Sequence, residues 1–289
     1  MSGEAPLVSA IITTYKREAE IVERAIRSIE EQTYRNIEVL VVDDNPNDSK
    51  YSRSVMEMCR LHPTVRYIKQ NGNKGACAAR NLGIVNANGM FIGCLDDDDL
   101  WLPEKIEKQL NVFQKDKDGK IGVVYCNGVR KDEDTGKETP YNSDENFREK
   151  AMLSELLGWD NIGSTSHPLI RRKCFRAVGY FWEEQPARQD YEMWIRILHA
   201  YEEVGINEKL FVHYIHLGDQ ISKNKKRAYI GYRNIYRRYR DEYRKNPKAE
   251  KRMLHNIVAN RTGITPAVIF YIARYYLLDF KIRYYQKRS

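Results

Sequence analysis

The sequence predicts an α/β fold with a mostly parallel, Rossmann-like central sheet, and two features support this prediction. Short apolar runs rich in β-branched residues alternate with segments of helical period through the first part of the chain, which is typical of parallel strands joined by crossover helices. Two of these runs, Ile37 to Val42 and Met90 to Leu95, are almost wholly apolar, as expected of strands that helices cover on both faces.

The N-terminal elements repeat a strand and helix rhythm. The residues from Leu7 to Thr14 favour a strand, and apolar positions between Ile21 and Ile29 fall on one face of a helix. Pro103 suits the first turn of a later helix. In order, we expect strands at 7–14, 37–42, 65–68 and 90–95, separated by helices at 21–29, 51–61 and 76–86.

The middle of the chain has a mixed pattern. A strand is expected at 121–126, and the polar, turn-rich residues 131–146 predict a surface loop or hairpin. Further on, we expect a helix near 152–157, a strand near 168–170 and a helix at 190–200. Beyond Ser222 the sequence predicts helices and no strand.

The composition is that of a folded globular protein, with 42% hydrophobic and 30% charged residues. The formal net charge is +8, and the excess of basic residues lies in the last third of the chain. Such a segment suits an anionic membrane surface, nucleic acid or a solvated helix face. Nucleic acid is not expected as a partner, because no helix-turn-helix, zinc or RNA-recognition motif accompanies the charge.

The cysteines and apolar segments bear on localisation. The five cysteines include no C-x-x-C pair, so we expect buried free thiols in a reducing compartment. The N-terminus does not resemble a signal peptide, and the apolar stretch from Ile264 to Phe280 is interrupted by Arg274 and Asp279. We therefore expect a cytoplasmic protein, either soluble or peripheral at the inner face of the plasma membrane.

Each of the two most apolar strands is followed by an acidic turn. Asp43 and Asp44 follow the first, and four consecutive aspartates, Asp96 to Asp99, follow the second. Ligands of open α/β sheets bind beyond the carboxyl ends of strands, so both turns are expected to face one site. Adjacent carboxylates repel each other unless a cation screens them, and hard oxygen ligands suit Mg²⁺ or Mn²⁺ with a diphosphate. A solvated turn that caps the next helix is the alternative.

Other polar residues near these turns are candidates for nucleotide binding. The carboxylate of Asp44 can accept hydrogen bonds from a ribose hydroxyl or a pyrimidine base, although a simple Asx turn explains this segment equally well. Lys74 lies in a glycine-containing loop before a helix, and Arg80 lies within that helix, so both are candidates for contact with phosphates. Neither the dinucleotide-binding nor the P-loop glycine motif is present.

Several ordered motifs carry a resemblance to a known family. They are Val8 to Tyr15, Val41 to Asp44, Asn73 to Gly75 with Ala79 to Asn81, Leu95 to Asp99 with Pro103, Asp190 to Arg196, and Tyr214 to His216 with Ser222. In order and spacing they resemble a family 2 glycosyltransferase with the GT-A fold, over roughly the first three quarters of the chain. The sequence departs from the family pattern at Asp97, usually a small residue, and at Asn45-Pro46, which leaves the preferred base open.

The resemblance implies roles on the donor side of the site. Thr13 and Tyr15 would line the pocket for the nucleotide base, and Asp44 would contact the base. Asp96 and Asp98 would form the D-x-D pair, with Asp98 as the direct ligand of Mg²⁺ or Mn²⁺.

The resemblance also implies a catalytic base. Asp190 would remove the proton of the acceptor hydroxyl as this attacks the anomeric carbon and inverts its configuration. An aspartate that only caps a helix is the structural alternative, although capping and catalysis are compatible. His216 would add to the metal or diphosphate shell, and a packed or surface histidine is the alternative there.

By the same resemblance we expect a GT-A catalytic domain at 1–221 and a basic, Tyr-rich helical extension at 222–289. The catalytic domain would comprise a nucleotide-sugar-binding half at 1–99 and an acceptor-side half at 100–221. Tyrosine and arginine recur at helical spacing in the extension, which suits the headgroup zone of a membrane. Packing of the tyrosine face on the catalytic domain, or on the second subunit of a homodimer, is the open alternative.

The sequence therefore predicts an inverting, metal-dependent glycosyltransferase of polysaccharide biosynthesis. It would move a hexose or N-acetylhexosamine from a nucleotide diphosphate, with UDP favoured, to a sugar hydroxyl of a glycan or polyprenyl-diphosphate-linked acceptor. A sugar-phosphate nucleotidyltransferase is one rival, but it would need a glycine-rich loop after the first strand, where Thr13 to Arg17 has no glycine. A non-catalytic sugar-nucleotide-binding protein is the other, and the presence of Asp98 and Asp190 disfavours it.

Overall fold

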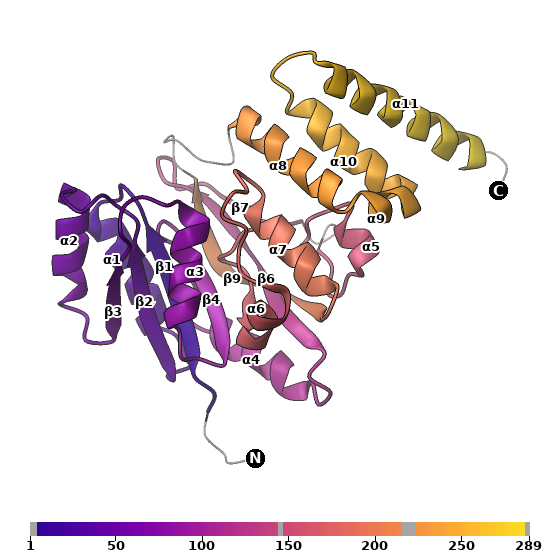
Figure 1. The fold of residues 1–289 in the computed structure, drawn as a ribbon. Helices are drawn as coiled ribbons and strands as arrows, with labels where there is room; N and C mark the ends of the chain where they lie inside the picture. The colour runs from indigo at the N-terminus through magenta and orange to yellow at the C-terminus, as the bar shows by residue number, and fades with distance from the viewer. Residues whose placement is uncertain (1–4, 144–146, 216–223, 287–289) are drawn as a thin grey trace.

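The computed structural model describes residues 5–143, 147–215 and 224–286 and has an α/β architecture (Figure 1). Within these residues the central sheet has nine strands, in the order β3-β2-β1-β4-β8-β6-β9-β5, with β7 paired to β6. The strands are β1 Val8–Thr14, β2 Ile37–Asp43, β3 Val65–Lys69, β4 Phe91–Asp96, β5 Leu100–Trp101, β6 Ile121–Asp132, β7 Glu138–Pro140, β8 Leu169–Arg171 and β9 Glu202–Ile215.

The strand directions bring the acidic turns to one edge. β3, β2, β1 and β4 are parallel, and Thr13 on β1 lies opposite Val42 on β2 and Asp96 on β4. Beyond β4 the sheet is mixed, because β8 runs antiparallel to β4 and β6 while β6 and β9 form a long parallel pair. Most paired residues belong to parallel pairs, so the predicted mostly parallel α/β sheet is confirmed.

The helices follow the order that the sequence predicts, with some additions. The predicted helices correspond to α1 to α5 and α7, and the predicted helical C-terminus corresponds to α8 to α11. The bounds are α1 Ala19–Glu30, α2 Lys50–Cys59, α3 Ala76–Asn86, α4 Lys105–Lys115, α5 Leu153–Leu156, α6 Arg172–Val178, α7 Gln189–Leu198, α8 Lys225–Arg238, α9 Arg240–Lys245, α10 Pro247–Ala259 and α11 Pro266–Gln286.

Two hydrophobic clusters cover the two faces of the sheet. On β1, Ala10 and Ile12 belong to a cluster with residues of α1, α2 and α4, whereas Ile11 belongs to a cluster with residues of α3, α6 and α7. This alternation explains the nearly continuous apolar strand sequences, since each strand is covered on both sides. The five cysteines are all buried and free, as predicted.

Three elements were not predicted, and β6 is longer than predicted. β5 and α6 are short, and β9 contains an exposed polar segment, Asn207 to Lys209, with register irregularities against β6 nearby. These residues break the alternation of polar and apolar positions by which a strand is recognised. The predicted loop or hairpin at 131–146 contains a hairpin in which β7 pairs with the end of β6, and residues 144–146 lie outside the described residues.

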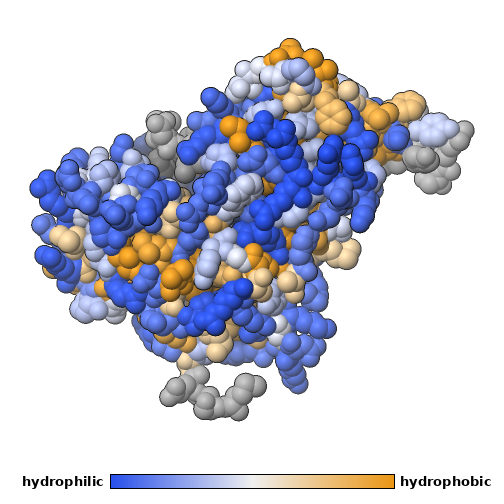
Figure 2. All heavy atoms as spheres, in the orientation of Figure 1, coloured by the Kyte–Doolittle hydropathy of each residue, from blue (hydrophilic) through white to orange (hydrophobic). Residues whose placement is uncertain are grey.

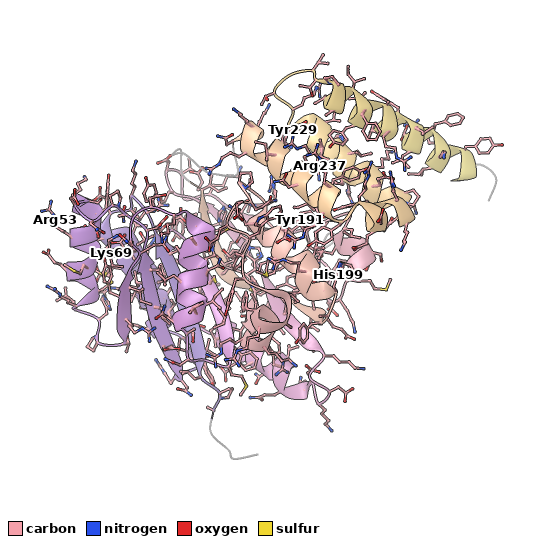
Figure 3. All side chains as sticks on the ribbon, viewed as in Figure 1. Arg53, Lys69, Tyr191, His199, Tyr229 and Arg237 are labelled. Atoms are coloured by element: carbon pink, nitrogen blue, oxygen red, sulfur yellow. The ribbon has the colours of Figure 1, made fainter. Side chains whose placement is uncertain are left out.

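The C-terminal helices pack on the sheet domain. Tyr236 and Tyr243 belong to the same buried cluster as Trp194 of α7, and Figure 3 shows Tyr191 in the interior below α8. Gly231 of α8 approaches the backbone of Ala187 so closely that an added Cβ would lie 2.3 Å from the Ala187 carbonyl oxygen. The tyrosine face of α8 therefore packs on this chain, as one of the two alternatives predicted.

The described part of the C-terminal region is helical and contains no strand, as predicted. α11 is the outermost helix, at the end of the molecule remote from α2 and β3 (Figure 1). Of the helices in the described ranges, none combines the length and apolarity needed to cross a membrane. The predicted boundary at residue 222 falls in 216–223, outside the described residues, and stays a prediction.

Candidate active site at the carboxyl ends of the strands

Asp96 ends β4 and is held by side chains from two other segments. Its Oδ1 accepts a hydrogen bond from Arg80 Nη2 of α3 at 2.7 Å and another from Thr165 Oγ1 at 3.2 Å. Burial opposes ionisation of Asp96, but the charge and hydrogen bond of Arg80 outweigh it and lower the pKa of the carboxyl. Arg80 and Asp96, both predicted site residues, therefore form an ion pair at the strand end.

Arg17, which the sequence analysis did not select, binds the next two aspartates. It lies in the loop after β1, and its Nε and Nη2 lie 3.0 Å from Asp97 Oδ1 and 2.8 Å from Asp98 Oδ2. Burial raises the pKa of Asp97 to about 7, despite the attraction of Arg17. The repulsion predicted within the aspartate run is thus offset partly by a guanidinium.

Asp99, the last residue of the aspartate run, binds a serine and a histidine. Its Oδ2 accepts a hydrogen bond from Ser166 Oγ at 2.6 Å, and its Oδ1 lies 2.9 Å from Nδ1 of His213 on β9. Burial raises the pKa of Asp99 to about 6, and the hydrogen bond to Asp99 raises the pKa of His213 against the effect of burial. Among the described residues, His213 is the histidine that contacts the acidic turn. The predicted His216 lies outside the described residues.

The second acidic turn is fully engaged in hydrogen bonds. Asp44 Oδ1 and Oδ2 accept hydrogen bonds from the backbone N–H groups of Lys74 and Gly75, each at 2.8 Å, and Gln70 also donates to Oδ1. Asp43 accepts hydrogen bonds from Asn45, Ser52 and Tyr67. Asp44 thus fixes the loop that precedes α3, beside the end of β1.

Asp190 lies in the first turn of α7. The N-cap of this helix is Arg188, whose φ of 62° is left-handed, and not Asp190 as the capping alternative supposed. Burial raises the pKa of Asp190, and the negative charge of Asp96 raises it further. The hydrogen bond from the Tyr191 N–H and the charges of Arg188 and Arg80 act in the opposite direction and lower it. Asp190 and the carboxyl end of β4 therefore lie in one electrostatic environment.

A second partly buried carboxyl, that of Asp160, interacts electrostatically with Asp190. Burial and the charge of Asp190 raise the pKa of Asp160 well above its usual range, although its Oδ1 accepts a hydrogen bond from Gly163 N–H at 3.0 Å. The sequence analysis did not select Asp160, because a single aspartate in an irregular segment carries no periodic or motif signal.

The remaining predicted residues lie around the same edge. Thr13 is near the end of β1 and partly buried, and Tyr15 follows the strand with 42% of its surface exposed. Lys74 is exposed in the loop that Asp44 holds. The structure thus brings the described predicted residues to the carboxyl ends of the parallel strands and the start of α7.

The carboxylates fit a divalent cation that shares a diphosphate. In the described residues, no group of three or more His, Cys, Asp or Glu side chains is arranged to hold a metal ion by itself. Mg²⁺ in nucleotide sites binds through one or two carboxylates and completes its shell with phosphate oxygens and water. Asp98, with 19% of its side chain exposed, provides such a hard oxygen donor beside Asp96.

Comparison with known sequences decides the family. The family model described as Glycosyl transferase family 2 matches residues 9–179. The chain belongs to glycosyl transferase family 2. In this family 2 chain the matched segment includes β1, both acidic turns and α6, and ends before Asp190.

Two relatives with curated sequences are named as glycosyltransferases. An uncharacterized glycosyltransferase of Rickettsia felis is 34% identical over 196 residues, which are 67% of this chain and 31% of the relative. A second one, of Rickettsia bellii, is 33% identical over 204 residues, which are 66% of this chain and 27% of the relative. The family 2 chain thus matches about a third or less of the length of these two proteins.

Solved structures share the fold. Mannosyltransferase PcManGT from Pyrobaculum calidifontis, in complex with GDP-Man and Mn²⁺, has a TM-score of 0.63 at 17% identity and covers 97% of this chain and 86% of its own. Residues 1–349 of S. aureus TarS, in complex with UDP-GlcNAc, have a TM-score of 0.61 at 15% identity, with 96% and 91% covered. This family 2 chain has the GT-A fold, and the predicted family and fold are confirmed.

Proposed function

We propose that this chain is an inverting glycosyltransferase that moves a hexose or N-acetylhexosamine from a nucleotide diphosphate, with UDP favoured, to a sugar hydroxyl. Membership of glycosyl transferase family 2 supports the reaction class and disfavours a nucleotidyltransferase. One structural observation carries the mechanism. Asp190, a partly buried carboxyl in the first turn of α7, lies near enough to Arg80 and Asp96 at the end of β4 for their charges to shift its pKa.

Asp190 serves as the general base. It accepts the proton of the acceptor hydroxyl while the hydroxyl oxygen forms a bond to the anomeric carbon, and the bond from that carbon to the diphosphate breaks on the opposite side. A positioned carboxylate contributes typically about 10²- to 10⁴-fold to such a step. Because burial raises the pKa of Asp190, its carboxylate is a stronger base than that of an exposed aspartate.

The donor is held by the acidic turn after β4 and the loop before α3. Asp98 holds Mg²⁺ or Mn²⁺, which neutralises the charge that develops on the leaving diphosphate. Arg80 fixes Asp96 through their ion pair, and Lys74, which is exposed in the loop before α3, would bind phosphate oxygens of the donor. In this proposal His216 also contributes to the shell around the metal and diphosphate. Among the described residues, His213 is the histidine that contacts Asp99.

The nucleotide base binds beside the end of β1. Thr13 and Tyr15 line its pocket, and Asp44 shapes that pocket through its hydrogen bonds to Lys74 and Gly75. UDP is the proposed nucleotide. The fold is compatible with both UDP-GlcNAc and GDP-Man, since these are the donors present in the TarS and PcManGT complexes.

The proposed acceptor is a glycan or a polyprenyl-diphosphate-linked sugar in polysaccharide biosynthesis. The proposal divides the chain into a catalytic domain at 1–221, with donor and acceptor halves at 1–99 and 100–221, and an extension at 222–289. The extension would hold the protein at the cytoplasmic face of the plasma membrane, since α11 exposes aromatic side chains such as Phe270 and Phe280.

Calorimetric titration of the full chain with UDP, GDP and dTDP, each with and without Mn²⁺, tests the donor assignment. We expect metal-dependent binding of UDP, and we expect Asp98→Asn to weaken it by removing one charge from the metal ligand. Asp118→Asn, at an exposed position outside the site, is the matched control. Binding of none of the three nucleotides would overturn the donor assignment, and metal-independent binding would remove Asp98 from its role.

A further inference from the structure

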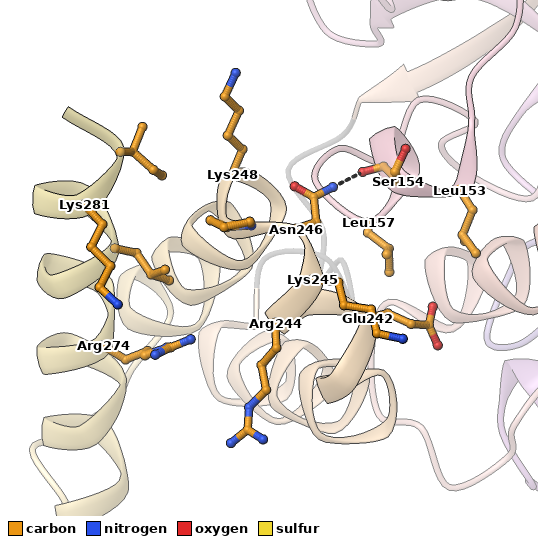
Figure 4. Close-up of a pocket in the computed structure, with 13 residues that line it drawn as sticks. Leu153, Ser154, Leu157, Glu242, Arg244, Lys245, Asn246, Lys248, Arg274 and Lys281 are labelled. Atoms are coloured by element: carbon orange, nitrogen blue, oxygen red, sulfur yellow. Dashed lines mark hydrogen bonds between the residues drawn. The ribbon is translucent and has the colours of Figure 1, made fainter. Parts of the chain in front are cut away.

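A cavity of about 850 Å³ lies between α5, α9, the start of α10 and α11, and shares no residue with the candidate active site (Figure 4). Its walls include the side chains of Leu153 and Leu157 on one side and of Leu278 and Ile282 of α11 on the other. Leu157 and Leu278 are 3% and 4% exposed. The deep part of the cavity is therefore apolar.

The rest of the cavity lining is strongly basic. Figure 4 shows Lys281 and Arg274 extending from α11 toward the helices that carry Lys245 and Lys248. Glu242 is the acidic residue of the lining, and its Oε2 lies 3.3 Å from His199 Nε2. The cavity therefore combines an apolar interior with an excess of positive charge.

Three of these cations have no acidic partner within the described residues. Nearby, Arg274 binds the buried Glu250 at 2.9 Å, and Asp279 pairs with both Lys251 and Arg283. By contrast, none of the three lysines of the cavity forms an ion pair with a residue that the structure describes; they are Lys245, Lys248 and Lys281. Figure 4 shows the three side chains on different sides of the cavity, so together they give its rim a positive potential that favours an anionic ligand.

The N-terminus of α10 adds to the positive potential. Asn246 caps this helix, its Oδ1 accepting from Ala249 N–H at 3.1 Å and its Nδ2 donating to Ser154 O at 2.8 Å. Asn246, Pro247 and Lys248 all line the cavity. The positive end of the helix dipole thus lies at the same wall as the unpaired lysines.

The outer surface of α11 continues the apolar character of the cavity. Phe270, Tyr276, Leu277 and Phe280 have 50%, 65%, 46% and 68% of their surfaces exposed. Figure 2 shows hydrophobic atoms along the outer edge formed by the C-terminal helices, next to strongly hydrophilic atoms. Exposed aromatic side chains beside lysine and arginine are typical of helices that lie in a membrane interface.

We propose that this cavity binds the phosphate group and adjoining acyl chain of an anionic membrane phospholipid, while α11 lies against the bilayer surface. The positive charge of Lys245, Lys248 and Lys281 around the rim attracts the phosphate, and the leucines of the cavity contact the hydrocarbon. This lipid site deepens the proposed function, on which it rests, because it would hold the transferase at the surface that contains a lipid-linked acceptor.

Flotation of the full chain with vesicles tests the site without any nucleotide sugar. Vesicles of phosphatidylcholine alone are compared with vesicles that also contain phosphatidylglycerol. The cavity variant combines Lys245→Glu, Lys248→Glu and Lys281→Glu. The matched control combines Lys115→Glu, Lys117→Glu and Lys137→Glu, which are exposed, lie outside the cavity and change the net charge equally.

We expect wild type to bind the anionic vesicles and not the neutral ones. A lysine near an anionic surface contributes about 1 kcal/mol, so three substitutions correspond to roughly 100-fold weaker binding of the cavity variant. The control should bind within a few-fold of wild type. Equal losses in the two triple variants would show that net charge alone attracts the protein, and would overturn the cavity site.

Two further measurements distinguish the occupant. The double variant Phe270→Ser with Phe280→Ser should bind vesicles more weakly, because α11 loses contact with the bilayer. Its binding should still require phosphatidylglycerol, because the phosphate site is intact. Calorimetry measures whether glycerol 3-phosphate binds as well. If wild type binds it as tightly as it binds the vesicles, and the cavity variant does not bind it, the cavity takes a free phosphate compound and the lipid assignment is overturned.

The same variants separate this inference from the proposed transferase activity. Sugar transfer to a water-soluble acceptor should be unchanged in the cavity variant, since none of its residues lies at the strand ends. If wild type transfers sugar but does not bind vesicles, the lipid site is refuted and the proposed function is not. Vesicle binding that depends on the three lysines, without turnover of any nucleotide sugar, would support the lipid site and refute the proposed function.

Discussion

The guanidinium of Arg17 and the carboxylate of Asp98 form an ion pair, with Nη2 and Oδ2 2.8 Å apart. The same guanidinium reaches Asp97 through Nε at 3.0 Å. The proposed metal ligand is thus also the partner of a fixed cation from the loop after β1. A metal ion that binds Asp98 has to compete with Arg17, and its affinity therefore depends on that residue.

Replacing Arg17 should strengthen metal binding. In Arg17→Ala the carboxylate of Asp98 loses its competing cation, so we expect Mn²⁺ to bind about two- to fivefold more tightly in the presence of UDP, as for loss of a partly exposed ion pair. Calorimetric titration of Mn²⁺ measures this. Arg27→Ala, which breaks an exposed pair with Glu23, is the control. Weaker UDP binding in Arg17→Ala would instead show that Arg17 itself binds the diphosphate.

The sequence predicted the first half of the fold well because its signal is local. Alternating apolar strands and amphipathic helices specify β1 to β4 and α1 to α4 through residues close together in the chain. β9 escaped prediction because Asn207 to Lys209 is polar and exposed, and its pairing partner β6 lies far away in sequence. α6 spans seven residues, too few for helical periodicity to be recognised.

Most carboxylates of the candidate site were predicted, together with Arg80 as the partner of Asp96, whereas Arg17 and His213 were not. Position at strand ends selected Asp44 and the run from Asp96 to Asp99, since topology alone brings such turns together, and the family resemblance then singled out Asp96 and Asp98. Arg17 and His213 contact the acidic turn across 81 and 114 residues of sequence. Such contacts depend on how the loops fold, and no spacing rule in a single sequence encodes them.

Asp190→Asn should abolish sugar transfer and leave donor binding intact. The amide cannot accept the acceptor proton, so kcat should fall about 10²- to 10⁴-fold, while the dissociation constant for UDP should stay within a few-fold of wild type. Tyr191→Phe is a suitable control, because its backbone N–H still donates to Asp190 while its hydroxyl contacts with Leu156 O and Leu157 O are lost. Turnover retained in Asp190→Asn would exclude Asp190 as the base.

The pH dependence of the wild type provides an independent check on Asp190. A base must be ionised to act, and burial raises the pKa of Asp190. The rate should therefore decline as the pH falls through this raised pKa, at a higher pH than an exposed aspartate would give. A profile of kcat/KM against pH measures the decline. In Asp190→Asn the residual rate should no longer decline at acidic pH. An unchanged decline in this variant would mean that another group titrates there.

Gly231→Ala should destabilise the protein even though alanine favours helices. In a free helix this change would stabilise by about 1 kcal/mol. At this position the new Cβ would lie 2.3 Å from the carbonyl oxygen of Ala187, so α8 has to move away from the segment before α7, and overpacking of this kind costs about 1–3 kcal/mol.

Urea denaturation of Gly231→Ala and wild type measures the difference in the free energy of unfolding. Arg237→Ala, on the exposed side of α8, reports what helix propensity alone contributes and should be nearly neutral. Because the segment that meets Gly231 leads directly to Asp190, displacement of α8 should also raise KM for the acceptor more than KM for the donor. An increase in stability in Gly231→Ala would mean that α8 is not held against Ala187, and the close packing of the C-terminal helices on the catalytic site would then be wrong.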